Sequence, residues 1–348
     1  MFKLKINYRL ILFPLSFLYA LVTEIRNFLY DFQIFKSYRF YIPVINVGNL
    51  SVGGSGKTPQ IEYLIHLLEQ DYKVAVISRG YKRKTKGFIV ANESVNAKII
   101  GDEPYQIFRK FKDNANVIVA VGEDRVEAIR RVYTKFKPDI VLLDDAYQHR
   151  AVKAGLNILL TPYQFPFFND WVLPTGNLRE CRWQARRADI VLITKTPNIL
   201  TKSTKEYYVK KVKTYTNAPV FFSSISYDHR VINEKAEILW KHLSPYSVLL
   251  ITGIANPEPL YSFLSEKNIN FEGLKFGDHH FFSKKDVQRI KRIFSQIKNE
   301  KKVILTTEKD YVRLQNFFGD ELFYLPIQTK VIENEMFNKK ILKYVNNN

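Results

Sequence analysis

Short, uninterrupted runs of β-branched and other apolar residues alternate with helical stretches between residues 41 and 194. The runs show little polar alternation, which indicates strands that are buried on both faces. Helical stretches such as 59–69 and 124–136 lie between them. This order predicts an α/β fold built on a doubly wound parallel sheet. The apolar runs occupy residues 41–47, 73–78, 116–121, 139–143, 157–161 and 189–194.

A second series of apolar runs and helical stretches follows the first. With 348 residues, the chain is about twice as long as a typical domain, which favours two domains. The helical stretch near residues 204–215 is the expected transition. We therefore predict an N-terminal amphipathic helix in residues 1–30, a main domain in 31–215 and a smaller C-terminal α/β domain in 216–348. The second series has apolar runs at 218–223, 247–252, 302–306 and 322–325, and helical stretches at 257–266 and 284–298.

A glycine-rich segment, residues 48–59, joins the first apolar run to the first helix. Backbone N–H groups in such a loop can surround phosphate oxygens, and the helix N-terminus adds its dipole. Lys57 can reach the β- and γ-phosphates of ATP, and the Thr58 hydroxyl can bind Mg²⁺. Ser51 stands where the usual spacing has its first glycine. The predicted fold is therefore of the P-loop NTPase type, with a nucleotide-binding loop that includes Gly53, Gly54, Ser55 and Gly56.

Two aspartates, Asp144 and Asp145, end the apolar run 139–143. A carboxylate at the carboxyl end of a neighbouring parallel strand faces the same crevice as the phosphate loop, where Mg²⁺ bridges phosphate oxygens. Adjacent residues of a strand point to opposite faces, so one aspartate can bind metal while the other orients it or the loop. The sequence leaves this division open. A histidine near a strand end, such as His149, is commonly a structural hydrogen-bonding residue.

The chain is strongly basic, with 53 Lys and Arg residues against 34 Asp and Glu residues and a net charge of +19. This surplus indicates an anionic partner, which can be a phosphate compound, nucleic acid or an acidic membrane. The single cysteine, Cys181, cannot form an internal disulfide, which favours a reducing compartment and a packing role.

Apolar residues in the N-terminal segment recur at helical spacing, with basic residues on both sides. The run 10–22 has 13 residues, too few for a spanning helix, which needs about 20. The pattern suits an amphipathic helix that lies in a membrane interface, or equally a helix docked on its own domain's core. The apolar positions are Leu10, Phe13, Phe17, Leu21, Ile25 and Phe28.

A set of motifs in this chain resembles the tetraacyldisaccharide 4'-kinase family, the lipid A 4'-kinases of Gram-negative bacteria. The resemblance extends in order from the N-terminal helix to about residue 314. It implies transfer of the ATP γ-phosphoryl group to the 4'-hydroxyl of a tetraacylated, 1-phosphorylated glucosamine disaccharide, with Mg²⁺. The family's loop also lacks the first glycine. The motifs are residues 47–59, 78–81, 101–104, 121–125, 144–150, 178–180, 276–279 and 307–310.

The resemblance also implies roles for individual residues. Asp102 corresponds to the family's catalytic base, and His279 orients or tunes it, although His280 is adjacent. Without the family, Asp102 is equally well explained as a helix N-cap. Asp144 and Asp145 complete the Mg²⁺ site, with Glu103 as a further contact, and Asp145 also belongs to the catalytic group.

The remaining implied residues concern the phosphates. Arg79 and Arg179 are candidates for stabilising the transferring phosphoryl group, because a guanidinium can bind two of its oxygens. Either arginine can instead anchor a carboxylate or bind the lipid's 1-phosphate. Gln148 and His149 are similar to positions that line the family's site, on the nucleotide or phosphate side. We expect the second domain to close over the nucleotide and to bring His279 to Asp102.

The expected partners follow from the same resemblance. They are the lipid A precursor, tetraacyldisaccharide 1-phosphate, and the cytoplasmic face of the bacterial inner membrane, bound peripherally; no nucleic acid or protein partner is predicted. A membrane-associated partitioning ATPase is one alternative, but such proteins carry lysine before the glycine pair, where this chain has Val52. A nucleic-acid-dependent ATPase also explains the charge, yet the aromatic residues cluster with apolar ones and no nucleic-acid fold signature is present.

Overall fold

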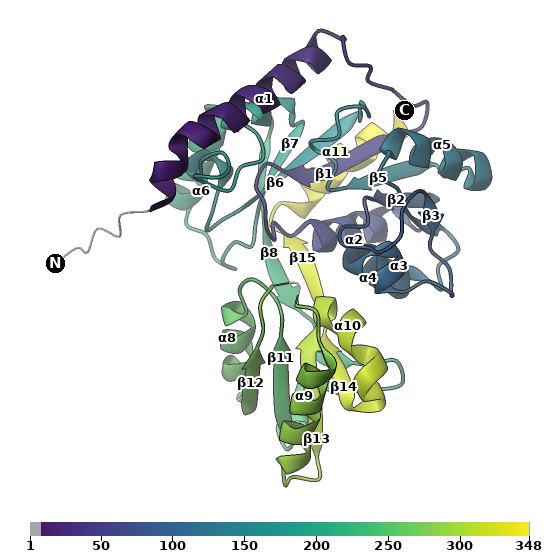
Figure 1. The fold of residues 1–348 in the computed structure, drawn as a ribbon, viewed down its shortest axis with the longest axis vertical. Helices are drawn as coiled ribbons and strands as arrows, with labels where there is room; N and C mark the ends of the chain where they lie inside the picture. Colours follow the sequence, from purple (N-terminus) through teal and green to yellow (C-terminus); the bar gives the residue numbers. More distant parts are fainter. Residues whose placement is uncertain (1–7, 279, 348) are drawn as a thin grey trace, which may run out of the picture.

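The computed structural model describes residues 8–278 and 280–347, which form a large and a small α/β lobe (Figure 1). Within these residues the large lobe is built on a nine-stranded sheet with the order β15-β8-β7-β6-β1-β5-β2-β4-β3. Its strands are parallel except for β3 and β15, which run antiparallel to their neighbours. The strands are β1 (Val44–Asn49), β2 (Val74–Ser78), β3 (Ile89–Val90), β4 (Val117–Val121), β5 (Ile140–Asp144), β6 (Leu156–Pro162), β7 (Ile190–Thr194), β8 (Val220–Tyr227) and β15 (Ile327–Val331).

Helices cover both faces of this sheet, as the predicted doubly wound fold requires. Apolar side chains of α2 (Lys57–Leu68), α4 (Asp102–Phe111) and α11 (Asn334–Asn346) pack on one face. Helix α5 (Arg125–Phe136) and helix α6 (Lys202–Lys213) cover the two halves of the other face. The central strands are buried along their whole length, which explains their uninterrupted apolar sequences. Shorter elements are α3 (Ala97–Ile100), η2 (Phe167–Asn169) and η3 (Arg182–Arg187).

The small lobe has its own sheet, with the order β10-β9-β14-β13-β11-β12 among the described residues. Helices α9 (Lys284–Gln296) and α10 (Glu308–Phe318) pack on one face, and α7 (Trp240–Leu243) and α8 (Glu258–Glu266) on the other. The predicted second α/β domain is therefore present. Its strands are β9 (Arg230–Ile232), β10 (Glu237–Leu239), β11 (Ser247–Thr252), β12 (Phe271–Lys275), β13 (Lys302–Thr307) and β14 (Leu322–Leu325), and η4 (Gly319–Glu321) precedes the last of them.

The boundary between the lobes differs from the expected one after residue 215. Strand β8 pairs with β7 in the large sheet, and β15 returns to pair with β8 from Val331 opposite Ser223 to Ile327 opposite Tyr227. Helix α11 then packs on the large lobe. The expected domain 216–348 is therefore too wide, because the small lobe is inserted between β8 and β15 and this antiparallel pair joins the two lobes (Figure 1).

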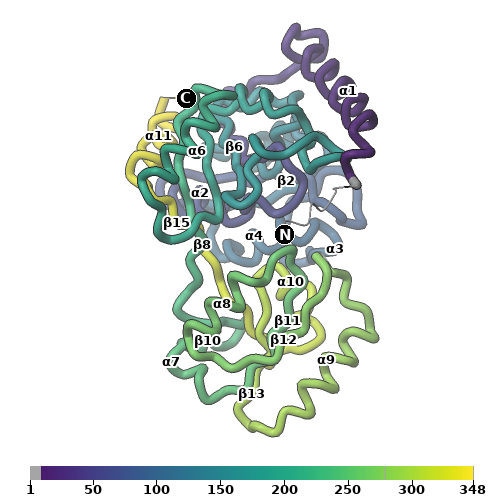
Figure 2. Tube along the Cα trace, turned by 90° about the vertical axis from the view of Figure 1, so that its left-hand side faces the viewer, coloured from purple at the N-terminus to yellow at the C-terminus, as the bar shows by residue number. Residues whose placement is uncertain are grey.

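Helix α1 (Phe13–Asp31), preceded by η1 (Tyr8–Leu12), lies along the outside of the large lobe (Figures 1 and 2). Its buried residues are Ser16 and Asn27, both polar. The six apolar positions singled out above are 47–67% exposed, so the alternative of a helix docked by its apolar face on the core is wrong. The helical segment Arg9–Asp31 has 23 residues and is long and apolar enough to cross a membrane by length and composition. The helical segment is therefore longer than the 13-residue apolar run indicated.

Candidate functional site

The glycine-rich loop connects β1 to α2 at the carboxyl edge of the large sheet, as predicted. Gly53 and Gly56 have φ angles of 101° and 84°, a region that glycine adopts without steric cost. Gly56 is the residue that precedes the first turn of α2, which begins with Lys57 and Thr58. Ser51 instead forms an antiparallel bridge with Leu178. Its extended backbone requires no glycine, which explains why the usual first glycine can be absent.

Two residues that sequence analysis did not single out fix the shape of this loop. The Lys195 Nζ donates to the Gly54 carbonyl oxygen at 2.7 Å, and the Thr194 Oγ1 donates to the Ser55 carbonyl oxygen at 2.8 Å. Thr194 is the last residue of β7 and Lys195 follows it, at the carboxyl end of this strand. Burial, together with the charges of Lys309 and Lys57, lowers the pKa of Lys195. The only sequence signal for Thr194 and Lys195 was their position at the end of a predicted strand.

Asp145 is tied to the cations of the site. Its Oδ1 lies 3.5 Å from the Lys57 Nζ and 3.1 Å from an Nη1 of Arg179. Although burial acts in the opposite direction, the charges of Lys57 and Arg179 lower the pKa of Asp145. The residue has a φ of 53°, which turns the chain as it leaves β5. Asp145 is therefore an ionised anchor for the loop lysine.

Asp144 differs from Asp145 in its surroundings. It is the last residue of β5, is 4% exposed, and its Oδ1 has no hydrogen-bond partner among the described residues. Burial and the neighbouring Asp145 charge raise the pKa of Asp144 to about 7, against the opposing effect of Lys57. A buried carboxylate oxygen without a partner is suited to a cation. The two aspartates thus differ: Asp145 is paired with two cations, and Asp144 has an oxygen that is suited to a cation.

The donor set fits Mg²⁺ only if nucleotide oxygens contribute. Within residues 8–278 and 280–347, no group of three or more His, Cys, Asp or Glu side chains is arranged to hold a metal ion. Mg²⁺ is commonly bound by one or two carboxylates together with substrate phosphates and water. Asp144 and the Thr58 hydroxyl are the residues that would hold it. The Glu103 charge also acts on Asp144, and the metal contact of Glu103 stays a prediction.

The small lobe contacts the candidate base directly. Asp102 begins α4, and Arg313 of α10 donates to its Oδ2 from both Nε, at 3.0 Å, and Nη2. Lys309, also on α10, lies 3.8 Å from Glu103 and 3.5 Å from Asp278. Neither cation was predicted, because nothing in the local sequence of α10 indicates which residues of α4 it meets.

His279, the predicted partner of Asp102, lies outside the described residues. The neighbouring His280 is placed: its Nε2 lies 3.1 Å from Asp286 Oδ2, and its ring packs against Phe276 and Phe282. Asp286 is part of the capping box at the start of α9. His280 is thus a structural residue of the small lobe.

Arg79 follows β2 and is exposed. Burial, with a further contribution from the Arg79 charge, lowers the pKa of the neighbouring Arg125 to about 10. Arg125 is 3% exposed, and Asp144 and Asp145 act on it electrostatically. Burial and Arg125 lower the pKa of His149 to about 4, so the imidazole is neutral at pH 7. Arg125, the first residue of α5, is thus close enough to Asp144 and Asp145 for their charges to act on it.

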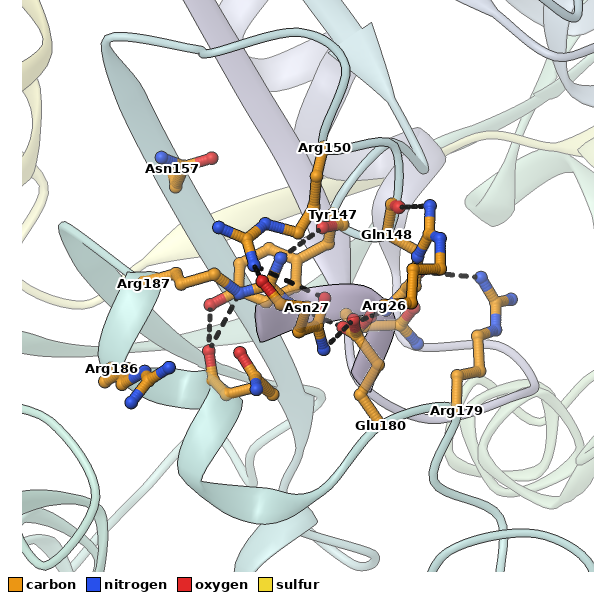
Figure 3. Close-up of polar contacts among 12 residues, drawn as sticks. Arg26, Asn27, Tyr147, Gln148, Arg150, Asn157, Arg179, Glu180, Arg186 and Arg187 are labelled. Carbon is orange, nitrogen blue, oxygen red and sulfur yellow. Dashed lines mark hydrogen bonds and ion pairs between the residues drawn. The ribbon is translucent and has the colours of Figure 1, made fainter. Parts of the chain in front are cut away.

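A polar network connects α1 to the site (Figure 3). Arg179 donates to Asp145 and, at 3.4 Å, to the Gln148 Oε1. The Gln148 Nε2 donates to the Asn49 carbonyl oxygen and to Glu180, and the buried Glu180 accepts from Asn27 of α1 at 3.0 Å. Gln148 thus links Asn49, at the end of β1, to Arg179, and its place on the nucleotide or phosphate side stays a prediction.

Comparison with known proteins decides the family. The family model LpxK, described as tetraacyldisaccharide-1-P 4'-kinase, matches residues 8–346. The chain belongs to the LpxK family. This confirms the resemblance drawn from the motifs, and as a member the protein is a kinase.

Relatives with the LpxK activity in their names match along almost the whole chain. A tetraacyldisaccharide 4'-kinase of Flavobacterium psychrophilum is 48% identical over 96% of each chain. One of Bacteroides thetaiotaomicron is 41% identical, covering 97% of this chain and 93% of its own. The crystal structure of LpxK from Aquifex aeolicus in complex with ATP has a TM-score of 0.77 and 32% identity, covering 97% of this chain and 99% of that one. The predicted fold class is thereby confirmed.

Proposed function

We propose that the protein transfers the γ-phosphoryl group of ATP to the 4'-hydroxyl of tetraacyldisaccharide 1-phosphate. The observation that carries this proposal is the meeting of two parts of the site. The loop, with Lys57 paired to Asp145, binds ATP phosphates, while Asp102 stands where α4 meets α10, beside Glu103, whose charge acts on Asp144. The family and the ATP complex of a relative support the same reaction.

Phosphoryl transfer depends mainly on positioning and on stabilising the negative charge that spreads over the phosphoryl oxygens. The loop N–H groups and Lys57 bind the β- and γ-phosphates. Arg179, which lies beside Asp145, is the residue that we propose to stabilise the transferring phosphoryl group. When bound, Mg²⁺ would neutralise charge shared by the β- and γ-phosphates. Asp144 and Thr58 are the residues that would hold it.

The acceptor hydroxyl must lose a proton during transfer. Asp102 accepts it in this proposal, because a carboxylate within hydrogen-bond reach is an adequate general base for an alcohol. Its place at the first residue of α4 favours the ionised form, since a helix N-terminus stabilises negative charge. The role proposed for His279 is to orient this carboxylate.

We further propose that α1 binds the cytoplasmic face of the inner membrane. Its polar side is occupied by the protein, through Ser16 with Thr175 and Asn27 with Glu180. Its apolar side faces outward, and the exposed Trp171 ring extends it by contacting Phe13. A helix held by polar contacts with its apolar side exposed is suited to a lipid interface. The net charge of +19 adds attraction to anionic lipids.

Transfer of labelled phosphate from Mg-ATP to dispersed tetraacyldisaccharide 1-phosphate tests the proposed reaction. We expect label in the lipid at its 4'-position, and none with a matched lipid whose 4'-position is already phosphorylated. Hydrolysis of ATP with no label in either lipid would contradict the proposal and favour an ATPase of the partitioning type. Stimulation of hydrolysis by nucleic acid would favour the other alternative.

The double substitution Phe17→Glu and Leu21→Glu is expected to release the protein from anionic lipid vesicles. Both side chains are about half or more exposed on α1, at 67% and 47%. Burying one such side chain contributes about 1.5–3 kcal/mol, so each change should weaken binding roughly tenfold or more. Co-sedimentation with vesicles measures the loss. Met336→Glu is a matched control, because Met336 is 63% exposed on α11, across the large lobe from α1 (Figure 2). Equal release of both variants would argue against α1 as the membrane contact.

A further inference from the structure

The contact between Arg313 and Asp102 joins two lobes across 211 positions of sequence. Arg313 is on α10 in the small lobe, and Asp102 is on α4 in the large lobe. Both are largely buried, with side-chain exposures of 10% and 19%. Two guanidinium nitrogens, Nε and Nη2, donate to the same carboxylate oxygen, Oδ2. The contact therefore fixes the direction of the carboxylate, and not only its distance from a positive charge.

Arg313 is itself held by a buried carboxylate of the small lobe. Its Nη1 donates to the Asp310 Oδ1 at 3.2 Å, and Asp310 is fully buried. The Asp310 Oδ2 accepts from the Gly253 N–H at 2.7 Å and from the Thr307 Oγ1 at 2.8 Å. These partners follow β11 and end β13, so the carboxyl edge of the small sheet positions the guanidinium. Hydrogen bonds therefore connect the edge of the small sheet to Asp310, Asp310 to Arg313, and Arg313 to Asp102.

We propose that Arg313, oriented by Asp310, is a positioning residue for phosphoryl transfer that aims the Asp102 carboxylate at the acceptor hydroxyl. This inference rests on the proposed function, in which Asp102 is the base. Because Arg313 donates twice to one oxygen of Asp102, it fixes the orientation of this carboxylate in the site. The contact between the lobes through α10 thereby holds the base in place.

Lys309, the neighbouring cation on α10, does not duplicate the role of Arg313. Lys309 reaches Glu103 and Asp278, and the Glu103 charge acts on Arg313 as well as on Asp144. Lys309 therefore balances the acidic residues around Asp102, while the two-point contact of a planar guanidinium comes from Arg313. A lysine at position 313 keeps the charge but loses this geometry.

A double-substitution cycle with Asp102→Asn tests the proposal, with labelled lipid as the readout. We expect Arg313→Gln to lower kcat about 30- to 100-fold, with KM for ATP changed less than threefold, since a misplaced catalytic group can cost about 100-fold in rate. Arg313→Lys should recover only part of the loss. In the Asp102→Asn background, Arg313→Gln should lower kcat by less than threefold, because the group that it positions is already gone.

Controls separate this role from simple joining of the lobes. Arg292→Gln removes an exposed arginine from α9 and should leave kcat unchanged, and Asp310→Asn should reproduce the kcat loss of Arg313→Gln. A multiplicative loss in the double variant, or a rise in KM for ATP with kcat unchanged, would show that Arg313 only clamps the lobes and would overturn the proposal. If a folded Arg313→Gln protein kept the wild-type kcat, the positioning role of Arg313 would be overturned and the proposed function would stand. If the wild-type protein failed to label the lipid, both the proposed function and the role of Arg313 would be overturned.

Discussion

Asp144→Asn is expected to reduce lipid phosphorylation by roughly 10²–10³-fold, the usual cost of losing one group that stabilises transition-state charge, and to raise the melting temperature of the metal-free protein at pH 8. Both effects have one origin. The carboxylate is buried beside Asp145, and its Oδ1 has no hydrogen-bond partner among the described residues. When no cation is bound, this buried carboxylate lowers the stability of the folded protein.

The pH dependence of this cost has a definite sign. Burial and Asp145 raise the pKa of Asp144 to about 7 in the folded protein, while the unfolded value is near that of a free aspartate, about 4. Between these values the folded state holds a proton that the unfolded state has lost, so stability falls as pH rises from about 4 to 7. Asparagine carries no charge, and the stability gain of Asp144→Asn should therefore be larger at pH 8 than at pH 5.

Thermal unfolding at the two pH values, without Mg²⁺ or nucleotide, measures this difference. Asp113→Asn is a matched control, because Asp113 is exposed beyond the end of α4 and its substitution should change stability little at either pH. Mg²⁺ titrations in the presence of ATP should show weaker binding below pH 7 in the wild type, since the ion competes with a proton on Asp144. A stability difference that does not grow with pH would contradict a raised pKa.

The central strands and the phosphate loop could be predicted because their signals are local. A strand buried on both faces, such as β1, must be apolar along its length, and a loop that surrounds phosphates needs residues such as Gly53 and Gly56 at positive φ. Ser51 looked like a defect in the pattern. It is explained by the bridge to Leu178, a contact between segments that are distant in sequence.

Contacts between distant segments also account for what sequence analysis missed. Lys195 and Arg313 resemble other cations in a strongly basic chain, and only the fold brings one to Gly54 and the other to Asp102. The insertion of the small lobe between β8 and β15 was missed for the same reason. The run 218–223 has the composition of any buried strand, and its partner β15 lies about a hundred residues later.

The sequence left two environments open for the apolar side of α1, a membrane interface or the protein core. Apolar residues at helical spacing indicate an apolar face but do not show what covers it. The buried residues Ser16 and Asn27 decide the matter, since they show that the polar side packs on the protein. The same contacts connect α1 through Glu180 and Gln148 to Arg179. In the proposed function, the helix that meets the lipid surface is thus joined by hydrogen bonds to the residues that surround the phosphates.

Asp102→Asn is expected to lower kcat for lipid phosphorylation by about 10²–10⁴-fold, the usual contribution of a general base. Asparagine has nearly the same shape but cannot accept the proton. Because the loop and Lys57 bind the phosphates in this proposal, the Kd for ATP should change less than threefold. Single-turnover transfer and nucleotide titration measure the two quantities separately.

Asp113→Asn again serves as the matched control, and both proteins should be compared for thermal stability. Asp102→Asn removes the carboxylate that accepts from Arg313, so the lobes should contact each other less firmly and the melting temperature should fall slightly. If kcat falls strongly while the melting temperature falls only slightly, the loss of kcat is due to lost proton transfer and not to a weaker contact between the lobes. If kcat were instead retained while ATP affinity fell, Asp102 would belong to the contact between the lobes, and the base would have to be sought among the other carboxylates near Asp144, of which Glu103 is the nearest in sequence to Asp102.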